Sequence, residues 1–343
     1  MNALLLKAPS RLELVDWPTP EPTADEVLLR IRVCGICGSD IHGWDGSSGR
    51  RNPPLIMGHE AAGEIAGVGS AVTGWKIGER VTFDSSIWCG HCQYCRAGQV
   101  NRCENRRVVG VAPAGYCQHG AFAEYLALPA RIVYRLPENL SFRQAAWVEP
   151  ISIAVHAVHR VKVEKGATAV VVGGGLIGLL VVQTLRWAGA GRIIVVEPAE
   201  SRRQLALRLG ATETLESNDG TAKRIVESTR GGADLVFECV GFAPTVNLAI
   251  AAAKMGGSVV LVGNLSPTTD GFPLQQTVLR EVTIMGSCAS AGEIPLCLEL
   301  LSSGAIKTEP MTETAAPLSE GPQWFSQLSA PGGGKYMKVL LEP

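Results

Sequence analysis

The sequence lacks a long hydrophobic run. Its longest apolar stretch extends from Ala169 to Val182 and contains four glycines in fourteen residues. A helix that crosses a membrane needs about 20 consecutive apolar residues. The segment from Met1 to Lys7 offers only three consecutive leucines before its lysine, which does not match a secretory leader. We therefore expect no membrane partner and a cytoplasmic location.

The sequence also lacks an excess of charge of one sign. Its 31 basic and 32 acidic side chains leave a net charge of -1, which gives no general attraction to nucleic acid or to an anionic membrane. A small-molecule partner is therefore favoured. The chain has 343 residues without an internal repeat or a low-complexity tract. This length predicts about two domains, each with a core of its own.

Cysteine is plentiful, and four of the ten cysteines fall within one loop. Without a secretory leader, these thiols are more typical of metal ligands than of disulfides. Four thiolates at this spacing can surround one tetrahedral ion and leave no vacancy, as in structural zinc sites; they are Cys89, Cys92, Cys95 and Cys103. An iron–sulfur cluster is the competing use of such a set. His91 lies inside the loop, and we expect it to be solvated because four thiolates complete the shell.

A second group of metal-type residues precedes this loop. Zinc in a catalytic site takes about three protein ligands and keeps one position for water or substrate. Cys37, His59 and Glu60 suit that count. Cys34 and Cys37 could instead form a redox pair, but His59 and Glu60, which follow later in the sequence, favour a metal. We expect Cys34 to be a small buried residue at the end of a strand.

The stretch from Thr168 to Glu197 predicts a dinucleotide-binding unit. A short apolar strand leads directly into a G-x-G-x-x-G motif, and helix-forming residues follow it; the motif consists of Gly173, Gly174, Gly175, Leu176, Ile177 and Gly178. Gly173 permits a tight turn, Gly175 permits close approach of a pyrophosphate, and Gly178 permits the helix to pack on the strand. A second strand ends in Glu197, whose carboxylate would accept hydrogen bonds from the ribose hydroxyls.

The remaining patterns predict a β-rich first part and a second part in which strands alternate with helices. The early strands are expected at Ala3 to Lys7, Leu12 to Trp17 and Glu26 to Val33. The later helices are expected at Ile151 to Val161, Leu179 to Ala188, Ala222 to Thr229 and Pro244 to Lys254. The later strands are expected at Arg192 to Val196, Leu235 to Glu238, Ser258 to Val262 and Thr283 to Met285. Gly332 to Gly334 predict a turn before a last strand, Met337 to Leu341. The alternation in the second part is typical of a parallel sheet.

In their order along the chain, these motifs resemble the zinc-containing medium-chain dehydrogenases, and within them the branch of sorbitol dehydrogenase and threonine dehydrogenase. The resemblance covers essentially the whole chain and rests on Cys37 to His42, Gly58 to Glu60, the four-cysteine loop, Gly120 to Tyr125, Glu149-Pro150 and Gly173 to Gly178. It implies an α/β protein with two domains. A GroES-like β-rich catalytic domain would comprise residues 1–151 and 287–343, and a Rossmann domain with a doubly wound parallel sheet would comprise residues 152–286.

The resemblance also implies a reaction and roles for particular residues. Zinc would act as a Lewis acid on the alcohol oxygen, and the alcohol carbon would release hydride to a nicotinamide coenzyme. Ser39 would take the hydroxyl proton and His42 would pass it to solvent. Glu149 lies where simple alcohol dehydrogenases have a cysteine ligand, so it would bind the catalytic zinc directly or through water.

We expect two zinc ions per chain, and NAD rather than NADP as the coenzyme. The carboxylate of Glu197 would repel the 2′-phosphate of NADP. Arg202 is a further candidate coenzyme contact, and together with Arg203 it is the main argument for NADP. The resemblance implies a homodimer or homotetramer that pairs its coenzyme domains through the edge strand Thr283 to Met285.

The expected substrate is a secondary alcohol in a polyol, sugar alcohol or sugar acid, oxidised reversibly to the ketone, because Glu149 resembles the polyol branch. Cys288-Ala289 stands where the polyol enzymes have an Arg-Tyr pair, so sorbitol itself is less well supported. Arg50 and Arg51 could meet a substrate anion or form a solvated loop pair. An L-threonine 3-dehydrogenase-like enzyme, a simple secondary alcohol dehydrogenase and a catalytically silent zinc-stabilised dinucleotide-binding protein are the alternatives.

Overall fold

The computed structural model describes residues 1–266, 268, 270–311, 313–330 and 336–343. The chain divides into two compact units: the first comprises Met1–Glu149, Ser290–Ser302 and Thr312–Pro343, and the second comprises Pro150–Ala289 and Ser303–Met311. The domain boundaries expected from the sequence stay a prediction. The turn expected at Gly332 to Gly334 lies outside the described residues. Within the described ranges, no helix is both long enough and apolar enough to cross a membrane.

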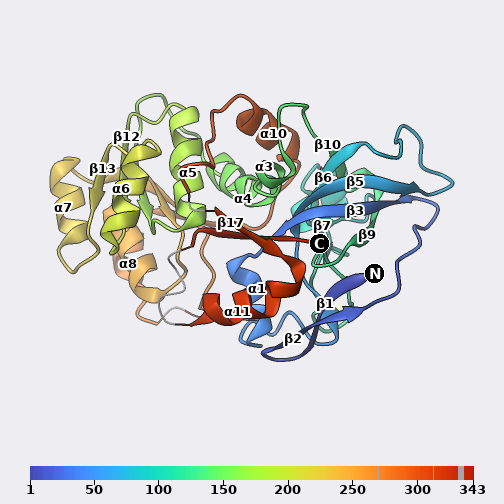
Figure 1. Cartoon of the computed structure of the whole chain (residues 1–343). Helices are drawn as coiled ribbons and strands as arrows, with labels where there is room; N and C mark the ends of the chain where they lie inside the picture. Colours follow the sequence, from blue (N-terminus) through green and yellow to red (C-terminus); the bar gives the residue numbers. More distant parts are fainter. Residues whose placement is uncertain (267, 269, 312, 331–335) are drawn as a thin grey trace. The chain divides into compact units, whose positions relative to one another are not determined.

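The first unit is built mainly on antiparallel strands. Its largest sheet has the order β10-β6-β5-β3-β18-β17, with β9 also paired to β3, and a smaller sheet has the order β2-β1-β4. The red carboxy-terminal strands join the blue strand β3 in this way (Figure 1). The strands are β1 Asn2–Ala8, β2 Arg11–Asp16, β3 Glu26–Gly35, β4 Leu55–Ile56, β5 Glu60–Val68, β6 Arg80–Phe83, β7 Ser86–Ile87, β8 Arg107–Val108, β9 Tyr125–Pro129, β10 Val133–Arg135, β17 Glu313–Pro317 and β18 Lys338–Glu342.

Short helices complete this unit and connect its strands. They are α1 Gly38–Trp44, α2 Gln93–Arg96, α3 Phe142–Ala145, α10 Ile294–Ser302 and α11 Gly321–Ser329, with the 3-10 turns η1 Val100–Arg102, η2 Ala130–Ile132 and η3 Leu318–Glu320. The longer helix α4 Val148–His159 follows α3. Because α1 begins directly after β3, the fold carries the chain from the central strand into the predicted metal-binding motif.

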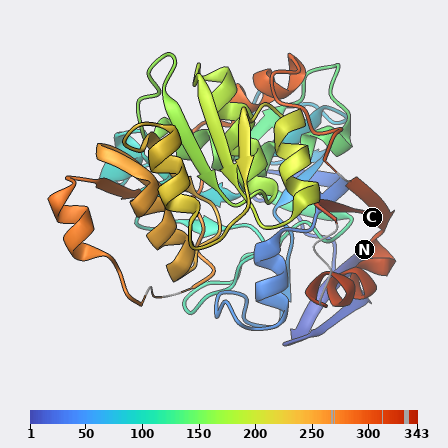
Figure 2. The ribbon, with the colours of Figure 1, turned by 90° about the vertical axis from the view of Figure 1, so that its left-hand side faces the viewer.

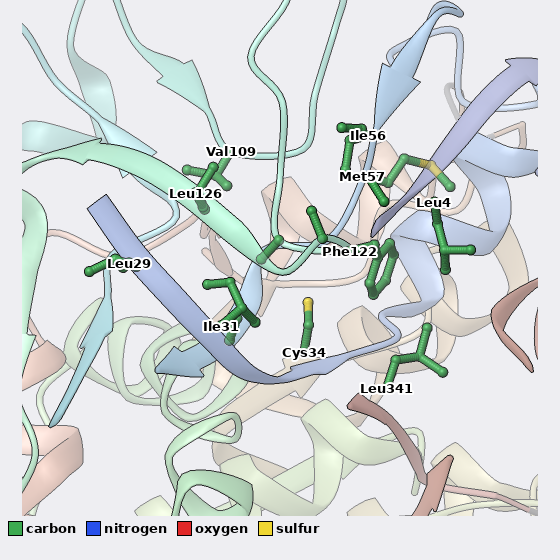
Figure 3. Packing of buried hydrophobic residues seen from close by; sticks show 14 of the residues in the cluster. Leu4, Leu29, Ile31, Cys34, Ile56, Met57, Val109, Phe122, Leu126 and Leu341 are labelled. Atoms are coloured by element: carbon green, nitrogen blue, oxygen red, sulfur yellow. The ribbon is translucent and has the colours of Figure 1, made fainter. Parts of the chain in front are cut away.

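The central strand β3 has the buried face that its sequence predicts. Val27, Leu29, Ile31 and Val33 are all at most 2% exposed, because alternate residues of a strand point to the same side of the sheet. Cys34 is completely buried in the same core, where it lies among apolar side chains such as Phe122 (Figure 3). The prediction that Cys34 is a buried residue at the end of a strand is therefore confirmed.

The second unit contains a six-stranded parallel sheet in the order β13-β12-β11-β14-β15-β16. Its strands are β11 Thr168–Val172, β12 Arg192–Val196, β13 Glu213–Leu215, β14 Ala233–Glu238, β15 Ala253–Leu261 and β16 Thr283–Gly286. Its helices α5 Leu176–Trp187, α6 Glu200–Arg208, α7 Thr221–Ser228, α8 Ala243–Ala252 and α9 Leu274–Leu279 connect the strands, and helices flank the yellow-green strands in Figure 2. The strand order reverses between β11 and β14, and open α/β sheets bind their ligands at such a reversal.

Two boundaries differ from the sequence-based expectation. Helix α4 begins at Val148, so Pro150 is its third residue. A proline is tolerated there because the first-turn N–H groups have no partner within the helix. Strand β15 begins at Ala253 and pairs with Ala233 of β14, whereas the helix had been expected to continue to Lys254. Pairing with the neighbouring strand overrides the helix preference of these residues.

Candidate functional site

The four-cysteine loop brings its thiols together as the spacing predicts. The ligand atoms of Cys89, Cys92, Cys95 and Cys103 all lie within 4.8 Å of one another. Two short helical turns bend the loop back on itself: α2, which contains Cys95, and η1, which precedes Cys103. The backbone N–H of Cys89 donates to Sγ of Cys103 over 3.3 Å. This compact set of four sulfurs fits a tetrahedral ion with no open position.

The loop favours a negative charge on two of its sulfurs, those of Cys89 and Cys92. The backbone N–H of His91 lowers the pKa of Cys89 to about 6, and the backbone N–H of Cys95 lowers the pKa of Cys92. Burial and the neighbouring thiols raise the pKa of Cys95 to about 12, because further negative charge accumulates poorly without a cation. His91 itself is exposed, as expected, and its Nδ1 lies 3.0 Å from the carbonyl oxygen of Cys89.

The second predicted cluster also forms within the first unit. The ligand atoms of Cys37, His59 and Glu60 lie within 4.8 Å of one another. Cys37 caps the start of helix α1, while His59 and Glu60 stand at the start of β5, where Glu60 pairs with Gly35 of β3. Adjacent strands therefore bring together residues that are more than twenty positions apart. The set supplies one sulfur, one nitrogen and one oxygen, a mixture that zinc accepts.

Asp40 lies behind this cluster and orients it. Its carboxylate is completely buried and accepts a hydrogen bond from the backbone N–H of Cys37 over 3.1 Å. Its Oδ1 lies 3.4 Å from Nδ1 of His59, which leaves Nε2 of that ring for a metal. A carboxylate behind a histidine is the usual support of a metal-binding imidazole. Burial alone would raise the pKa of Asp40, but the charges of His59 and Arg51 lower it to about 2.

Glu60 has a second buried partner that the sequence analysis missed. Nζ of Lys338, from strand β18, donates to Oε2 of Glu60, and both side chains are at most 2% exposed. The same ammonium group lies 5.6 Å from the centre of the Trp147 ring. Burial alone would lower the pKa of Lys338, but the charge of the Glu60 carboxylate is the largest of several contributions that raise this pKa, and the net shift is upward. The carboxylate of Glu60 is thus shared between the metal-type cluster and a buried cation.

Glu149 is buried but does not belong to the cluster of three. Its Oε1 accepts a hydrogen bond from Oγ of Ser85 over 3.0 Å. Burial raises the pKa of Glu149 to about 7, partly offset by the nearby charge of His59. A role for Glu149 as a metal ligand stays a prediction.

Ser39 and His42 lie on the same face of helix α1, three residues apart. Both are exposed, and Nδ1 of His42 lies 3.5 Å from Oγ of Ser47. Oγ of Ser39 accepts a hydrogen bond from Nη2 of Arg51 over 3.0 Å. The interpretation of Arg51 as part of a solvated loop pair is wrong, because this residue is only 7% exposed, whereas Arg50 is exposed.

The glycine motif of the second unit has a different physical reason at each glycine. Gly173 has a φ of +102°, which favours glycine, and a Cβ there would meet Val240 at 2.7 Å. A Cβ on Gly178 would lie 1.9 Å from the carbonyl oxygen of Gly173, so the helix packs against the turn. A Cβ on Gly175 would meet nothing within 4 Å, so space is left at the start of α5. Leu176 and Ile177 form the half-buried beginning of that helix.

Glu197 follows β12 and is 4% exposed. Its Oε2 accepts a hydrogen bond from the backbone N–H of Gly174 over 2.7 Å, and its Oε1 accepts one from Ala199 over 3.0 Å. Each carboxylate oxygen can accept a second bond, so a ribose contact remains compatible with this arrangement. Arg203 donates to the carbonyl oxygens of Glu197 and Pro198, while Arg202 is half-buried in the first turn of α6.

The contacts that the sequence analysis missed are made by polar or charged side chains that bind the predicted ones. Lys338 is the one charged residue in the expected last strand, Met337 to Leu341, and a buried lysine requires an anionic partner; this pattern could have revealed it. Asp40 follows Cys37 by three residues, the spacing at which a side chain can cap a helix start. Arg51 and Ser85 left no such trace, because their partners are 12 and 64 positions away.

Two family models match the chain. The model for the alcohol dehydrogenase GroES-like domain matches residues 23–138, and the model for zinc-binding dehydrogenase matches residues 177–303. D-xylulose reductase A of Aspergillus oryzae is 33% identical over 350 residues, which cover 99% of this chain and 96% of that protein. Sorbitol dehydrogenase of Bacillus subtilis is 32% identical over 316 residues, which cover 90% of this chain and 88% of that protein.

Solved structures agree with these sequence matches. A zinc-binding dehydrogenase from Sinorhizobium meliloti 1021, bound to NADP, has a TM-score of 0.89 at 32% identity and covers 100% of this chain and 99% of its own. An alcohol dehydrogenase from Escherichia coli CFT073, complexed with NADH, has a TM-score of 0.91 at 28% identity with the same coverage. The 2R,3R-butanediol dehydrogenase of Bacillus subtilis has a TM-score of 0.88 at 29% identity, again with coverage of 100% and 99%. The chain therefore belongs to the zinc-dependent medium-chain dehydrogenases, in the branch of sorbitol dehydrogenase.

Proposed function

We propose that this enzyme oxidises a secondary alcohol of a polyol, sugar alcohol or sugar acid to the ketone, reversibly, with transfer of hydride to NAD. The observation that carries the proposal is the cluster of Cys37, His59 and Glu60, which offers a mixed donor set next to an exposed serine on helix α1. Relatives named D-xylulose reductase and sorbitol dehydrogenase support a polyol or another secondary alcohol as the substrate.

The donor set fits a zinc ion, and Glu149 would complete it directly or through water. A zinc ion bound there would supply Lewis-acid polarisation of the alcohol oxygen. The residues of the chain would do the rest. Asp40 holds the His59 ring, Ser39 offers an oxygen that can accept the hydroxyl proton, and His42 lies on the same helix face to pass that proton to solvent.

We propose the Gly173 to Gly178 turn as the coenzyme site, with Glu197 at the adenosine ribose and Arg202 nearby. The family uses a nicotinamide coenzyme, and solved relatives hold NADP or NADH. Our preference for NAD rests on the carboxylate of Glu197, which disfavours a second anionic group beside it. Both terminal amino groups of Arg203 already donate hydrogen bonds within the chain, which supports the same preference.

We further propose a second, structural zinc in the four-cysteine loop, hence two zinc ions per chain. We also propose the catalytic domain at residues 1–151 and 287–343 and the coenzyme domain at residues 152–286. A homodimer or homotetramer formed through the edge strand β16 completes the proposal. A cytoplasmic location remains an expectation from the sequence.

A coenzyme-reduction screen tests this function. The purified enzyme is assayed with NAD and with NADP against sugar alcohols, aldonates, phosphorylated polyols, threonine and short secondary alcohols, and kcat/KM is compared. We expect the highest kcat/KM with NAD and a polyol or sugar acid. If a short unbranched alcohol is better by about tenfold, which is a difference of about 1.4 kcal/mol in transition-state binding, the polyol assignment is wrong. A threonine optimum would overturn the substrate class, and equal rates with NADP would overturn the coenzyme preference.

A further inference from the structure

Arg51 is a buried cation that joins two functional side chains. Its side chain is 6% exposed, and its Nη2 donates to Oδ1 of Asp40 and to Oγ of Ser39, each over 3.0 Å. One amino group of a guanidinium carries two hydrogens, so it can make both bonds at once. A buried charge is stable only when it is paired, and here its two partners are the support of His59 and the expected proton acceptor.

The fold holds this guanidinium in place from both ends. The backbone around Arg51 is fixed to Ala112, because the N–H of Asn52 donates to the Ala112 carbonyl over 2.9 Å and the Ala112 N–H donates to Arg50 over 3.1 Å. Its side chain passes directly over Gly43 of helix α1, where a Cβ would lie 1.9 Å from Cδ of Arg51. The absence of a side chain at Gly43 thus makes room for the arginine.

We propose that Arg51 is a positioning residue that orients the hydroxyl of Ser39 for proton transfer and links it to Asp40 behind His59. The proposal rests on the proposed function, in which Ser39 accepts the proton of the alcohol. A serine hydroxyl has one hydrogen and two acceptor lone pairs. Arg51 occupies one lone pair, so the other is left to accept from an incoming hydroxyl and the hydrogen of Ser39 is left to be donated onward.

The chemistry of a guanidinium determines in which direction a proton can leave Ser39. Arginine donates hydrogen bonds but accepts none, and it does not release its proton in proteins. A proton that reaches Ser39 therefore cannot leave through Arg51 and must leave through another acceptor. His42, on the same face of helix α1, is the acceptor that the proposed function assigns. A lysine at position 51 could pair with Asp40, but it lacks the planar fork that holds two partners in fixed directions.

A double-mutant cycle in the full-length, zinc-loaded enzyme tests this proposal. The variants are Ser39→Ala, Arg51→Lys and the double variant, and Arg11→Lys is the control because Arg11 is exposed and has no role in the site. We expect Ser39→Ala to lower kcat about a hundredfold, as for loss of a general base. We expect Arg51→Lys to lower kcat about tenfold, the effect of one charge-assisted hydrogen bond. The kcat of the double variant should be no lower than that of Ser39→Ala alone. KM for the coenzyme should be unchanged in every variant.

A second readout separates this role from simple support of the metal site. Zinc content and zinc affinity, measured by elemental analysis and by competition with a chelator, should be unchanged in Arg51→Lys. Gly43→Ala offers an independent route, because it displaces the arginine without removing its charge, and it should reproduce the loss of kcat.

The possible failures are distinguishable. If the effects of Ser39→Ala and Arg51→Lys multiply, Arg51 does not act through Ser39, and the inference is overturned while the proposed function stands. If kcat per bound zinc is normal in Arg51→Lys and only zinc is lost, the inference is likewise overturned. If Ser39→Ala leaves kcat unchanged, both the proton-accepting role of Ser39 and this inference are overturned.

Discussion

At the scale of single residues, the site depends on charges that the fold has removed from water. Asp40, Glu60 and Lys338 are each at most 2% exposed, and each has a partner of opposite charge. Isolated, such charges would be strongly unfavourable in the interior. Their pairing fixes the positions of the side chains that surround the predicted catalytic metal. Lys338 and a further buried residue, Asp84, each provide a test at this scale.

The first concerns Lys338. Replacing it in Lys338→Met leaves the Glu60 carboxylate buried without its cation, which should lower the free energy of unfolding by about 3–5 kcal/mol. The double variant Lys338→Met with Glu60→Gln should recover much of this loss, because neither charge of this pair then remains. Urea unfolding of the metal-free proteins measures both, because a zinc ion at the cluster of Cys37, His59 and Glu60 would itself compensate the carboxylate. A single variant within about 0.5 kcal/mol of the parent, the usual effect of a surface substitution, would show that the pair is not a buried one.

The second prediction concerns Asp84, which is 2% exposed. Its Oδ2 accepts a hydrogen bond from Oγ of Ser290 over 3.4 Å. Burial raises its pKa from 3.8 to about 6. The folded state therefore holds this proton more tightly than the unfolded state, so the stabilisation is complete below about pH 4 and is lost as the pH rises through about 6. The stability of the parent relative to Asp84→Asn should fall by about 1–3 kcal/mol over that range. The exposed residue Asp219 provides a control in Asp219→Asn, and a difference that is constant with pH would contradict the prediction.

At the scale of elements, each predicted site lies where one element ends and the next begins. The glycine turn joins β11 to α5, and Cys37 joins β3 to α1. The beginning of a helix leaves backbone N–H groups without partners inside the helix. Junctions of this kind also permit conformations that the interior of a helix or strand does not. The local sequence consequently reveals these sites well.

Two alanine substitutions should separate folding from coenzyme binding in the glycine turn. Gly178→Ala places a Cβ against the carbonyl oxygen of Gly173, so it should destabilise the fold by about 1–3 kcal/mol through overpacking. Gly175→Ala meets open space and should leave stability nearly unchanged while weakening coenzyme binding, because the methyl group occupies the approach of the pyrophosphate. Thermal unfolding without coenzyme and fluorescence titration with NADH measure the two effects. The reverse pattern would refute this assignment of the two glycines.

The two metal-type clusters should likewise respond differently to loss of one thiol. Cys103→Ser opens a closed set of four ligands and should destabilise or aggregate the protein, because metal binding there contributes to folding. Cys37→Ser should leave a folded protein without activity. Elemental analysis should find two zinc ions in the parent and one in Cys37→Ser. One metal ion in the parent, or an iron–sulfur absorption band, would disprove the two-zinc proposal.

At the scale of the whole molecule, the predicted assembly has a candidate surface in the second unit. Exposed apolar side chains occur in strand β15 and in helix α9, which precedes the edge strand β16. Met255 is 70% exposed, Leu274 and Val278 are each 64% exposed, and Leu279 is 69% exposed. Exposed apolar clusters of this kind mark protein–protein contacts. The pairing of two copies through β16 would cover them.

This surface gives the assembly prediction a specific test. The parent should be a dimer or tetramer by light scattering at micromolar concentration. Leu279→Arg should shift it towards the monomer, because a charge in an apolar contact is strongly unfavourable. Ile77→Arg replaces a residue that is 74% exposed in the first unit and should have no effect. A monomeric parent would rule out the proposed assembly.

The sequence by itself determined the features that depend on neighbouring residues. The four-cysteine spacing, the glycine turn between strand and helix, and the alternation of Val27, Leu29, Ile31 and Val33 all depend on local geometry. These patterns predicted a β-rich part and a parallel sheet, and both are present. The family resemblance added the reaction class, which no pattern of apolar residues carries.

Only the tertiary structure decided which buried charges meet. Lys338 reaches Glu60 across 278 positions, and Arg51 reaches Ser39 from a neighbouring loop. Such pairs depend on strand order and on the path of loops, and a single sequence encodes these only through packing. For the same reason the sequence left open whether Arg51 meets an anion or is solvated, whereas the fold buries this residue between helix α1 and the backbone near Ala112. The physical reason is that burial is a property of the assembled core, because a charge finds its partner only after distant segments have come together.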